Sequence, residues 1–265
     1  GLELRLWDAG TDLTLQVNVQ DAAWPVTVDP TLTPPLSVED KLRASDGAAD
    51  DYFGYSVSAA GDVDGDGYDD LVVGAPYDDD NGSYSGSAYV YYGTASGIDS
   101  ASEDKLLASD GAVFEYFGRS VSAAGDVDGD GYDDLVVGAY ADDDNGQNSG
   151  SAYVYYGTAS GIDSASEDKL LASDGAANDT FGWSVSAAGD VDGDGYDDLV
   201  VGALGDDDNG SQSGSAYVYY GTATGTDSAS EDKLSASDGG AADEFGWSVS
   251  AAGDVDGDGY DDLVV

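Results

Sequence analysis

Hydrophobic and polar residues alternate over short segments of this chain, and no segment shows the periodicity of a helix. Within one stretch, four segments rich in Val, Tyr or Leu are each bounded by clusters of Gly, Asp, Asn or Ser. These segments are Lys105–Ser109, Gly118–Ala124, Leu135–Ala139 and Ser151–Tyr156. The pattern predicts four short strands joined by turns, which together make one antiparallel sheet.

The same pattern recurs every 64 residues, and the Phe-Gly pairs that begin at Phe53, Phe117, Phe181 and Phe245 mark the recurrence. Residues 101–164 and 165–228 differ at only 11 of 64 positions. A tandem array of four-stranded units predicts an all-β fold, namely a β-propeller of antiparallel blades, because radial repetition hides sheet edges.

Residues 37–265 hold about three and a half repeats. A propeller ring typically has about 4–8 blades. We therefore expect that the array is part of a longer one, that a second copy closes the ring, or that the blades stay in an open array.

The first 36 residues do not share the repeat. Leu2, Leu4 and Leu6 alternate with polar residues, and a second alternating run over Leu13–Val19 follows a turn-like segment, which predicts a hairpin. A third short strand is expected around Trp24–Val28. We predict that residues 1–29 are the end of a preceding β-domain and that the Pro-containing residues 30–36 are a stiff linker.

The amino-acid composition limits the kinds of catalysis and ligand binding that the chain can support. The chain has 55 Asp and Glu against 7 Lys and Arg, a formal charge of −48, and no His or Cys. The absence of His and Cys excludes His-assisted nucleophiles and zinc or copper enzymes of the usual kind. The charge repels nucleic acid and anionic lipid, and it attracts hard cations. No apolar run is long enough for membrane insertion within this segment.

One acidic motif, Asp-x-Asp-x-Asp-Gly-x-x-Asp, occurs once in each repeat. Its first, third, fifth and ninth residues place carboxylates around one point, the glycine permits a sharp turn, and the seventh residue offers a backbone carbonyl. The predicted metal ligands are Asp62, Asp64, Asp66, Tyr68, Asp70, Asp126, Asp128, Asp130, Tyr132, Asp134, Asp190, Asp192, Asp194, Tyr196, Asp198, Asp254, Asp256, Asp258, Tyr260 and Asp262.

This oxygen shell suits Ca²⁺, and we expect one ion per repeat, four in all. The motif is not an EF-hand, because the twelfth position holds Val73 and its equivalents instead of a bidentate Glu. Mg²⁺ fits less well, since it demands a smaller octahedral cage. The alternative, a solvated Asx turn, explains a single copy better than it explains four copies at one spacing.

Together, the Phe-Gly pairs, the acidic loop that follows them and Gly74-Ala75-Pro76 resemble the FG-GAP repeat of the integrin α-chain propeller and its bacterial relatives. The resemblance implies calcium loops on one face, ligand contacts on the other, and secreted or cell-surface proteins that bind partners. The chain departs from the pattern where Tyr140 and Leu204 replace the proline. This departure and the near-identity of the repeats favour a bacterial or archaeal surface protein.

The differences between repeats suggest which end of the blades meets a partner. In a four-stranded antiparallel blade, the second-to-third connection and the link between blades lie at the end opposite the acidic loop. Most differences between repeats fall there, so we predict contacts from Tyr55, Arg119, Trp183 and Trp247, since Arg and aromatic residues dominate binding hot spots. The alternative is that these side chains only cap the packing of the blades.

Two further acidic patterns say less about the function of the chain. The runs Asp78–Asp80, Asp142–Asp144 and Asp206–Asp208 are expected to be solvated hairpin loops. A carboxylate pair for glycoside hydrolysis needs one unusual environment, whereas these aspartates recur in near-identical units.

These observations predict a non-catalytic, calcium-binding, extracellular or cell-surface propeller that acts in adhesion or protein–protein interaction. Its partner would be a protein or glycan on the face opposite calcium, or neighbouring copies of itself, and not nucleic acid. Two alternatives stay open: a structural array that forms a sheath, fibre or stalk, and an accessory propeller of a larger secreted enzyme that acts on polysaccharides.

Overall fold

The computed structural model describes residues 3–8, 13–18 and 41–265, and the chain divides into two compact units, Gly1–Lys41 and Leu42–Val265. In the first unit, β1 (Glu3–Asp8) pairs antiparallel with β2 (Leu13–Asn18), with Glu3 opposite Asn18. The expected strand around Trp24–Val28 and the linker 30–36 lie outside the described residues. The assignment of residues 1–29 to a preceding domain stays a prediction.

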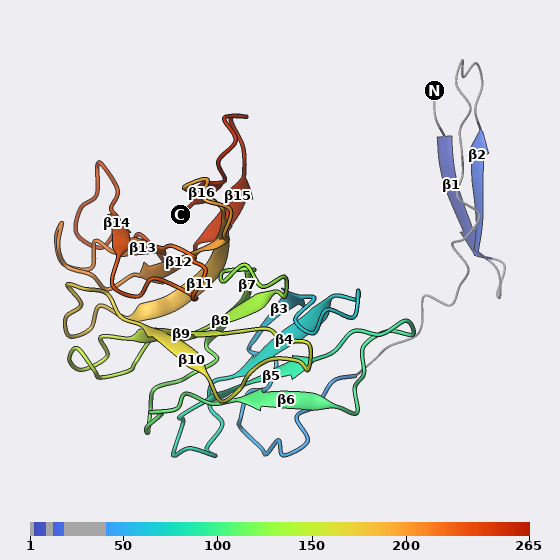
Figure 1. Cartoon of the computed structure of the whole chain (residues 1–265), viewed down its shortest axis with the longest axis horizontal. Helices are drawn as coiled ribbons and strands as arrows, with labels where there is room; N and C mark the ends of the chain where they lie inside the picture. Colours follow the sequence, from blue (N-terminus) through green and yellow to red (C-terminus); the bar gives the residue numbers. More distant parts are fainter. Residues whose placement is uncertain (1–2, 9–12, 19–40) are drawn as a thin grey trace. The chain divides into compact units, whose positions relative to one another are not determined.

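The second unit consists of successive antiparallel sheets whose strands follow one another in chain order (Figure 1). Three sheets have four strands each, and a two-stranded sheet follows them. The strands are β3 (Ser56–Gly61), β4 (Asp70–Ala75), β5 (Ser87–Tyr91), β6 (Glu103–Leu106), β7 (Ser120–Gly125), β8 (Asp134–Ala139), β9 (Ser151–Tyr155), β10 (Glu167–Leu170), β11 (Phe181–Gly189), β12 (Asp198–Ala203), β13 (Ser215–Tyr219), β14 (Glu231–Leu234), β15 (Ser250–Gly253) and β16 (Asp262–Val264).

The predicted all-β fold of four-stranded antiparallel blades is therefore confirmed, with one correction. The strand expected at Lys105–Ser109 is β6, Glu103–Leu106, and it pairs with β5 of the preceding blade, with Leu106 opposite Ala88. Buried Leu106 is the last residue of the strand, and Ser109 and Asp110 already form a turn. Each blade consequently begins near its Phe-Gly pair and ends in the next 64-residue unit.

Apolar side chains fill the space between neighbouring blades. Between the first two blades, Val72 and Val90 share a buried cluster with Leu135, Val137 and Tyr155. An equivalent cluster lies between the second and third blades. The second and third strands of the second blade are buried over their whole length, so apolar residues occupy both of their faces and the sheets pack face to face.

The Phe-Gly pair fastens the start of each blade. The ring of Phe117 is buried, and it meets Tyr153 and Tyr155 edge-on at centroid distances of 5.4 Å and 6.1 Å. Gly118 has a φ of +82°, and a Cβ there would lie 2.2 Å from the carbonyl oxygen of Ser87 in the preceding blade. The packing of the Phe117 ring and the close approach of the chain at Gly118 thus explain why a Phe-Gly pair recurs in each repeat.

The blade topology places two loop sets at opposite ends. The first-to-second connections lie at one end of the blades, and the second-to-third connections lie with the inter-blade links at the other. No helix occurs in the described ranges, so none of sufficient length and hydrophobicity to cross a membrane is found there.

Candidate metal centre

The acidic motifs form the first-to-second connections, at residues 62–70, 126–134, 190–198 and 254–262, which we call the metal loops. The ninth motif residue begins the second strand and anchors each loop. Asp134 is fully buried, and its two carboxylate oxygens accept hydrogen bonds from the backbone N–H groups of Val127 (2.9 Å) and Gly157 (2.8 Å). Asp70 and Asp198 are held in the same way.

Carboxylates of each motif converge where the spacing predicts. In the first loop, Asp62, Asp64 and Asp66 each offer an oxygen, and these oxygens lie within 4.8 Å of one another. In the second loop, Asp126, Asp128 and Asp134 do the same. The first, third, fifth and ninth motif positions therefore all take part in such groups.

Backbone hydrogen bonds hold the turn in shape. In the second loop, Asp126 Oδ2 accepts from Gly131 N–H at 3.0 Å, and Asp130 Oδ1 accepts from Tyr132 N–H at 3.0 Å. Gly131 has a φ of +94° with open space around it, so the backbone conformation, not crowding, requires glycine. The loops at 62–70, 190–198 and 254–262 carry the same two hydrogen bonds.

The metal loops hold negative charge without a basic partner among the described residues. Burial and, to a smaller extent, neighbouring carboxylates raise the pKa of Asp134 to about 8, although two backbone hydrogen bonds lower it. The same causes raise the pKa of Asp70 and Asp198 to about 6. Such shifts mean that burial and neighbouring negative charges destabilise the ionised carboxylates.

One buried carboxylate oxygen of the second loop accepts no hydrogen bond from the described residues. Oδ1 of Asp126 is buried and has no hydrogen-bond donor. A buried carboxylate oxygen without a partner is costly, and a cation held between Asp126, Asp128 and Asp134 would satisfy it. The donors are all oxygen atoms, which suits Ca²⁺ better than a soft metal.

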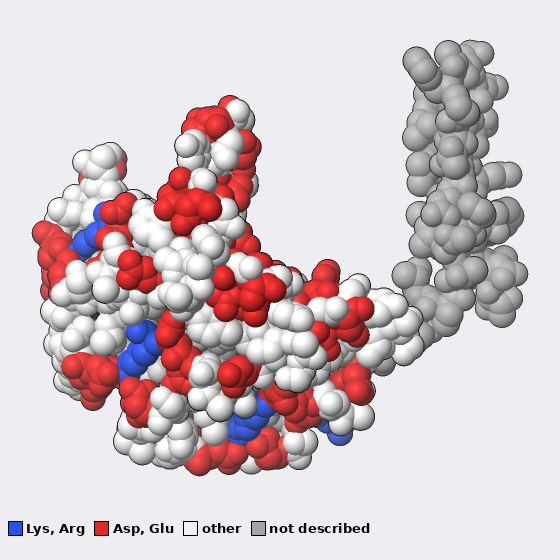
Figure 2. Space-filling model, in the orientation of Figure 1, with Lys and Arg blue, Asp and Glu red and all other residues white. Residues whose placement is uncertain are grey.

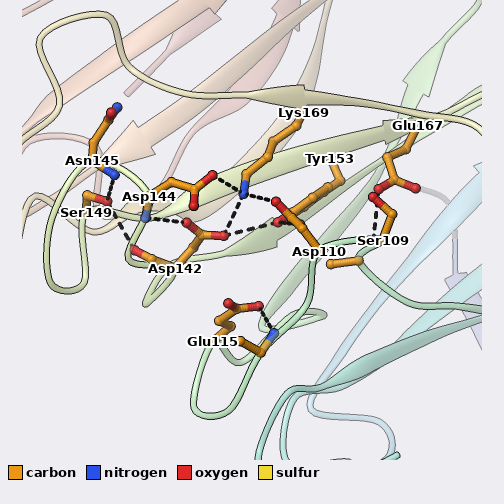
Figure 3. Close-up of polar contacts among 12 residues, drawn as sticks. Ser109, Asp110, Glu115, Asp142, Asp144, Asn145, Ser149, Tyr153, Glu167 and Lys169 are labelled. Atoms are coloured by element: carbon orange, nitrogen blue, oxygen red, sulfur yellow. Dashed lines mark hydrogen bonds and ion pairs between the residues drawn. The ribbon is translucent and has the colours of Figure 1, made fainter. Parts of the chain in front are cut away.

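Each four-stranded blade also contains a second acidic cluster, in which a lysine side chain supplies the positive charge. The Nζ atom of Lys169 lies 2.6 Å from Asp110, 2.9 Å from Asp142 and 2.7 Å from Asp144 (Figure 3). The hydroxyl of Tyr153 lies 2.9 Å from Asp110 and 3.1 Å from Asp142. We call this group a lysine hub. The equivalent hubs centre on Lys105 and Lys233.

The sequence predicts that the runs at 78–80, 142–144 and 206–208 are solvated, and this holds for the second and third residue of each run, which are exposed. It is wrong for the first residue of each run, which is buried in a hub. Asp142 is only 2% exposed, and Asp78 and Asp206 are equally buried. The hub lysines are three of the seven basic residues of the chain. Figure 2 shows Lys and Arg as isolated patches among acidic side chains.

The four predicted partner residues lie together. The guanidinium carbon of Arg119 lies 4.7 Å from the ring centroid of Tyr55 and 4.3 Å from that of Trp183. Trp183 in turn lies 5.5 Å from Trp247. Tyr55 is 45% exposed and Trp247 is 56% exposed. These residues are at equivalent positions in successive blades, so the blade arrangement brings them side by side.

Further aromatic side chains, which the sequence did not lead us to expect, extend this group. We call Tyr55, Tyr84, Phe114, Tyr116, Tyr140, Trp183 and Trp247 the aromatic row. Tyr116 stacks on Tyr140 at 5.4 Å, and Tyr140 meets Trp183 at 5.1 Å. Tyr84 and Phe114 pack at 5.6 Å and are both exposed. The signal was present, because all these rings lie in the second-to-third connections or in the inter-blade links, where the repeats differ.

Comparison with known proteins agrees with the blade pattern. A family model described as FG-GAP repeat matches residues 36–91, 101–155, 165–219 and 229–255, well over half of the chain. Integrin alpha-5 of Xenopus laevis is 36% identical over 163 residues, which cover 59% of this chain and 15% of that protein. Integrin alpha-7 of Homo sapiens is 36% identical over 155 residues, 58% of this chain and 12% of that protein.

Integrin alpha-V of Gallus gallus is 38% identical over 165 residues, which cover 59% of this chain and 15% of that protein. The match thus spans only a small part of the length of these relatives.

Proposed function

We propose that this chain, which belongs to the FG-GAP repeat family, is a calcium-stabilised extracellular segment that binds other proteins in adhesion and catalyses no reaction. The observation that carries the calcium part is the convergence of carboxylates in the metal loops without a basic partner, including the unsatisfied Oδ1 of Asp126. The integrin relatives support the adhesive part.

Calcium would act as a structural clip. The ligands of one loop come from both strands that the loop joins, because Asp126 follows β7 and Asp134 begins β8. A bound cation removes the repulsion among these carboxylates and fixes the turn. Without a bidentate twelfth ligand, affinity should be in the range of about 10⁻⁴–10⁻³ M, which suits a protein outside cells.

The calcium part is tested by isothermal titration of the purified chain with CaCl₂, and with MgCl₂ as the control. We expect four calcium ions per chain and much weaker magnesium binding. The paired changes Asp126→Asn and Asp128→Asn should reduce the stoichiometry to three. Absence of calcium binding at millimolar concentration would refute the clip.

The aromatic row would form the partner surface. Its exposed members, among them Tyr55, Tyr84, Phe114 and Trp247, provide apolar area at the end opposite the metal loops. The chain carries a charge of −48, so a partner with basic residues around an apolar patch is favoured over a second copy of this chain.

The surface is tested with the double change Trp183→Ala and Trp247→Ala. Partners captured by the wild-type chain from cell-surface extracts and then purified should bind this variant at least tenfold more weakly, since buried aromatic anchors contribute most of the affinity. Val255→Ala, in an exposed metal-loop position, is the control. Unchanged partner binding by the double variant would leave the row a packing feature only.

A further inference from the structure

The eighth residue of the second, third and fourth metal loops reaches the loop of the preceding blade. Asp133 Oδ2 accepts a hydrogen bond from the backbone N–H of Asp62 at 2.7 Å, and the N–H of Asp133 donates to the carbonyl oxygen of Asp62 at 3.2 Å. Asp197 holds Asp126 in the same way, at 2.9 Å and 3.2 Å, and Asp261 holds Asp190 at 3.1 Å in both bonds.

Shape complementarity accompanies these hydrogen bonds. A Cβ added to Gly61 would lie 2.2 Å from Asp133 Oδ2, and a Cβ added to Gly65 would lie 2.5 Å from the ring of Tyr132. Both glycines therefore allow the next loop to approach closely. A further backbone bond, from Thr158 N–H to the carbonyl oxygen of Val63 at 3.1 Å, adds a second point of attachment.

We infer that Asp133, Asp197 and Asp261 are positioning residues that couple the metal loops, so that a cation bound in one loop raises the affinity of the loop in the neighbouring blade. The inference rests on the proposed calcium function. Asp133 lies between Tyr132 and Asp134, two predicted ligands of its own loop, and it holds Asp62, the first predicted ligand of the preceding loop.

The coupling has a simple physical route. A cation that orders residues 126–134 also fixes the Asp133 carboxylate, and this carboxylate fixes the backbone from which the Asp62 side chain projects. Part of the ordering needed by the first loop is then already present before its own cation arrives. Coupling between binding sites is reciprocal, so filling of the first loop must favour the second equally.

The loop at 254–262 provides an internal contrast. Within residues 41–265, no following loop contacts it, and a Cβ added to Gly257 would meet nothing within 4 Å. A Cβ added to the equivalent Gly65, Gly129 or Gly193 would lie within 2.5 Å of a tyrosine ring. Where two loops adjoin, the tyrosine of the following loop therefore packs against the turn of the preceding one.

The experiment is a calcium titration of the whole chain followed by ¹H–¹⁵N NMR. The amide groups of Gly67, Gly131, Gly195 and Gly259 report on one loop each, because each donates to the first aspartate of its loop. The key variant carries Asp128→Asn and Asp130→Asn, which removes ligands from the second loop and leaves Asp133 in place.

Coupling predicts that this variant raises the calcium midpoint reported by Gly67 at least about fivefold, although no residue of the first loop has changed. Asp133→Ala should raise the same midpoint by a similar factor, and adding it to the double variant should raise it little further. Asp133→Asn, which keeps an acceptor oxygen, should restore a midpoint near that of the wild type.

Asp69→Ala is the matched control, because Asp69 has the same motif position but holds no other loop among the described residues. It should leave all four midpoints within twofold of their wild-type values. An unchanged Gly67 midpoint in the variant with Asp128→Asn and Asp130→Asn would overturn the coupling alone. No response of any of the four glycines to calcium would overturn the calcium function and the coupling with it.

Discussion

The metal loop and the lysine hub of one blade are both clusters of three or more carboxylates, yet they differ in how their charge is balanced. In the hub, Lys169 lies within 2.9 Å of Asp110, Asp142 and Asp144. In the metal loop, Asp126, Asp128 and Asp134 converge with no basic side chain among the described residues. One cluster contains its cation in the sequence, and under the proposed function the other obtains its cation from solution.

The pKa shifts of the two clusters have opposite directions. Burial raises the pKa of Asp110, but hydrogen bonds from Lys169 and Tyr153 outweigh it, so the pKa is lower than usual. Burial and like charges raise the pKa of Asp134 to about 8. Two acidic clusters that look alike in composition therefore respond oppositely to acid, and the position of a single lysine separates them.

Of the changes that distinguish the two clusters, removal of calcium should have the largest effect on the free energy of unfolding. At a calcium concentration ten times the dissociation constant, each filled loop contributes about 1.4 kcal/mol to the free energy of unfolding, or about 6 kcal/mol for four loops. Thermal unfolding with calcium and with excess chelator measures this contribution to stability. Sodium chloride at equal ionic strength is the control, because general screening of the −48 charge also stabilises the chain.

A substitution in the hub should destabilise the chain regardless of calcium. Lys169→Met leaves Asp142, which is almost fully buried, without its charge partner, and we expect a loss of about 3 kcal/mol. Urea unfolding of the variant and of Lys41→Met, a change at an exposed lysine, measures the difference. A loss that disappears when calcium is added would contradict the separation of the two clusters.

The pH dependence should reverse between the calcium-free and calcium-bound forms. Asp134 has a pKa of about 8 in the folded calcium-free chain, above its unfolded value, so the folded state binds more protons. Its contribution to stability is therefore present at low pH and is lost as pH rises from about 4 to about 8. Calcium requires the ionised carboxylates, so its stabilisation should grow over the same range.

The contribution of the hub to stability should change with pH in the opposite direction. The pKa of Asp110 and of Asp174 is lower in the folded chain, so their contribution is present above the usual Asp pKa and is lost on acidification below it. Chemical unfolding at pH 3 to 8, with and without calcium, separates the two clusters. In Asp134→Asn, the calcium-free loss of stability with rising pH should be smaller.

The smallest effect is expected from a hub hydroxyl. Tyr153→Phe removes the group that lies 2.9 Å from Asp110 and 3.1 Å from Asp142, while Lys169 stays in place. We expect a loss of about 1 kcal/mol, the size of one hydrogen bond, with no change in calcium stoichiometry. Tyr132→Phe, in the metal loop, is the matched control.

The sequence predicts the features of this chain that depend on local spacing. Strand alternation and bounding turns predict the blades, and the positions of Asp126, Asp128 and Asp134 within nine residues predict their convergence. The opposite location of the partner residues follows from strand order alone. Each of these inferences needs only neighbouring residues and a known sheet geometry.

The features that the sequence does not predict join distant segments. Lys169 meets Asp110 from 59 residues away, and Asp133 meets Asp62 from 71 residues away. Both contacts depend on how one blade sits against the next, which no local pattern reports. The acidic run at 142–144 is expected to be solvated for the same reason, since Lys169 is 27 residues from Asp142.

Hydrogen–deuterium exchange with and without calcium tests the difference between the two clusters most directly. The amides of Val127, Gly131 and Tyr132, which donate to metal-loop carboxylates, should exchange more slowly when calcium is present. The amide of Asp144, which donates to Asp142 in the hub, should exchange at the same rate in both conditions. Equal protection of both regions by calcium, or of neither, would contradict the account.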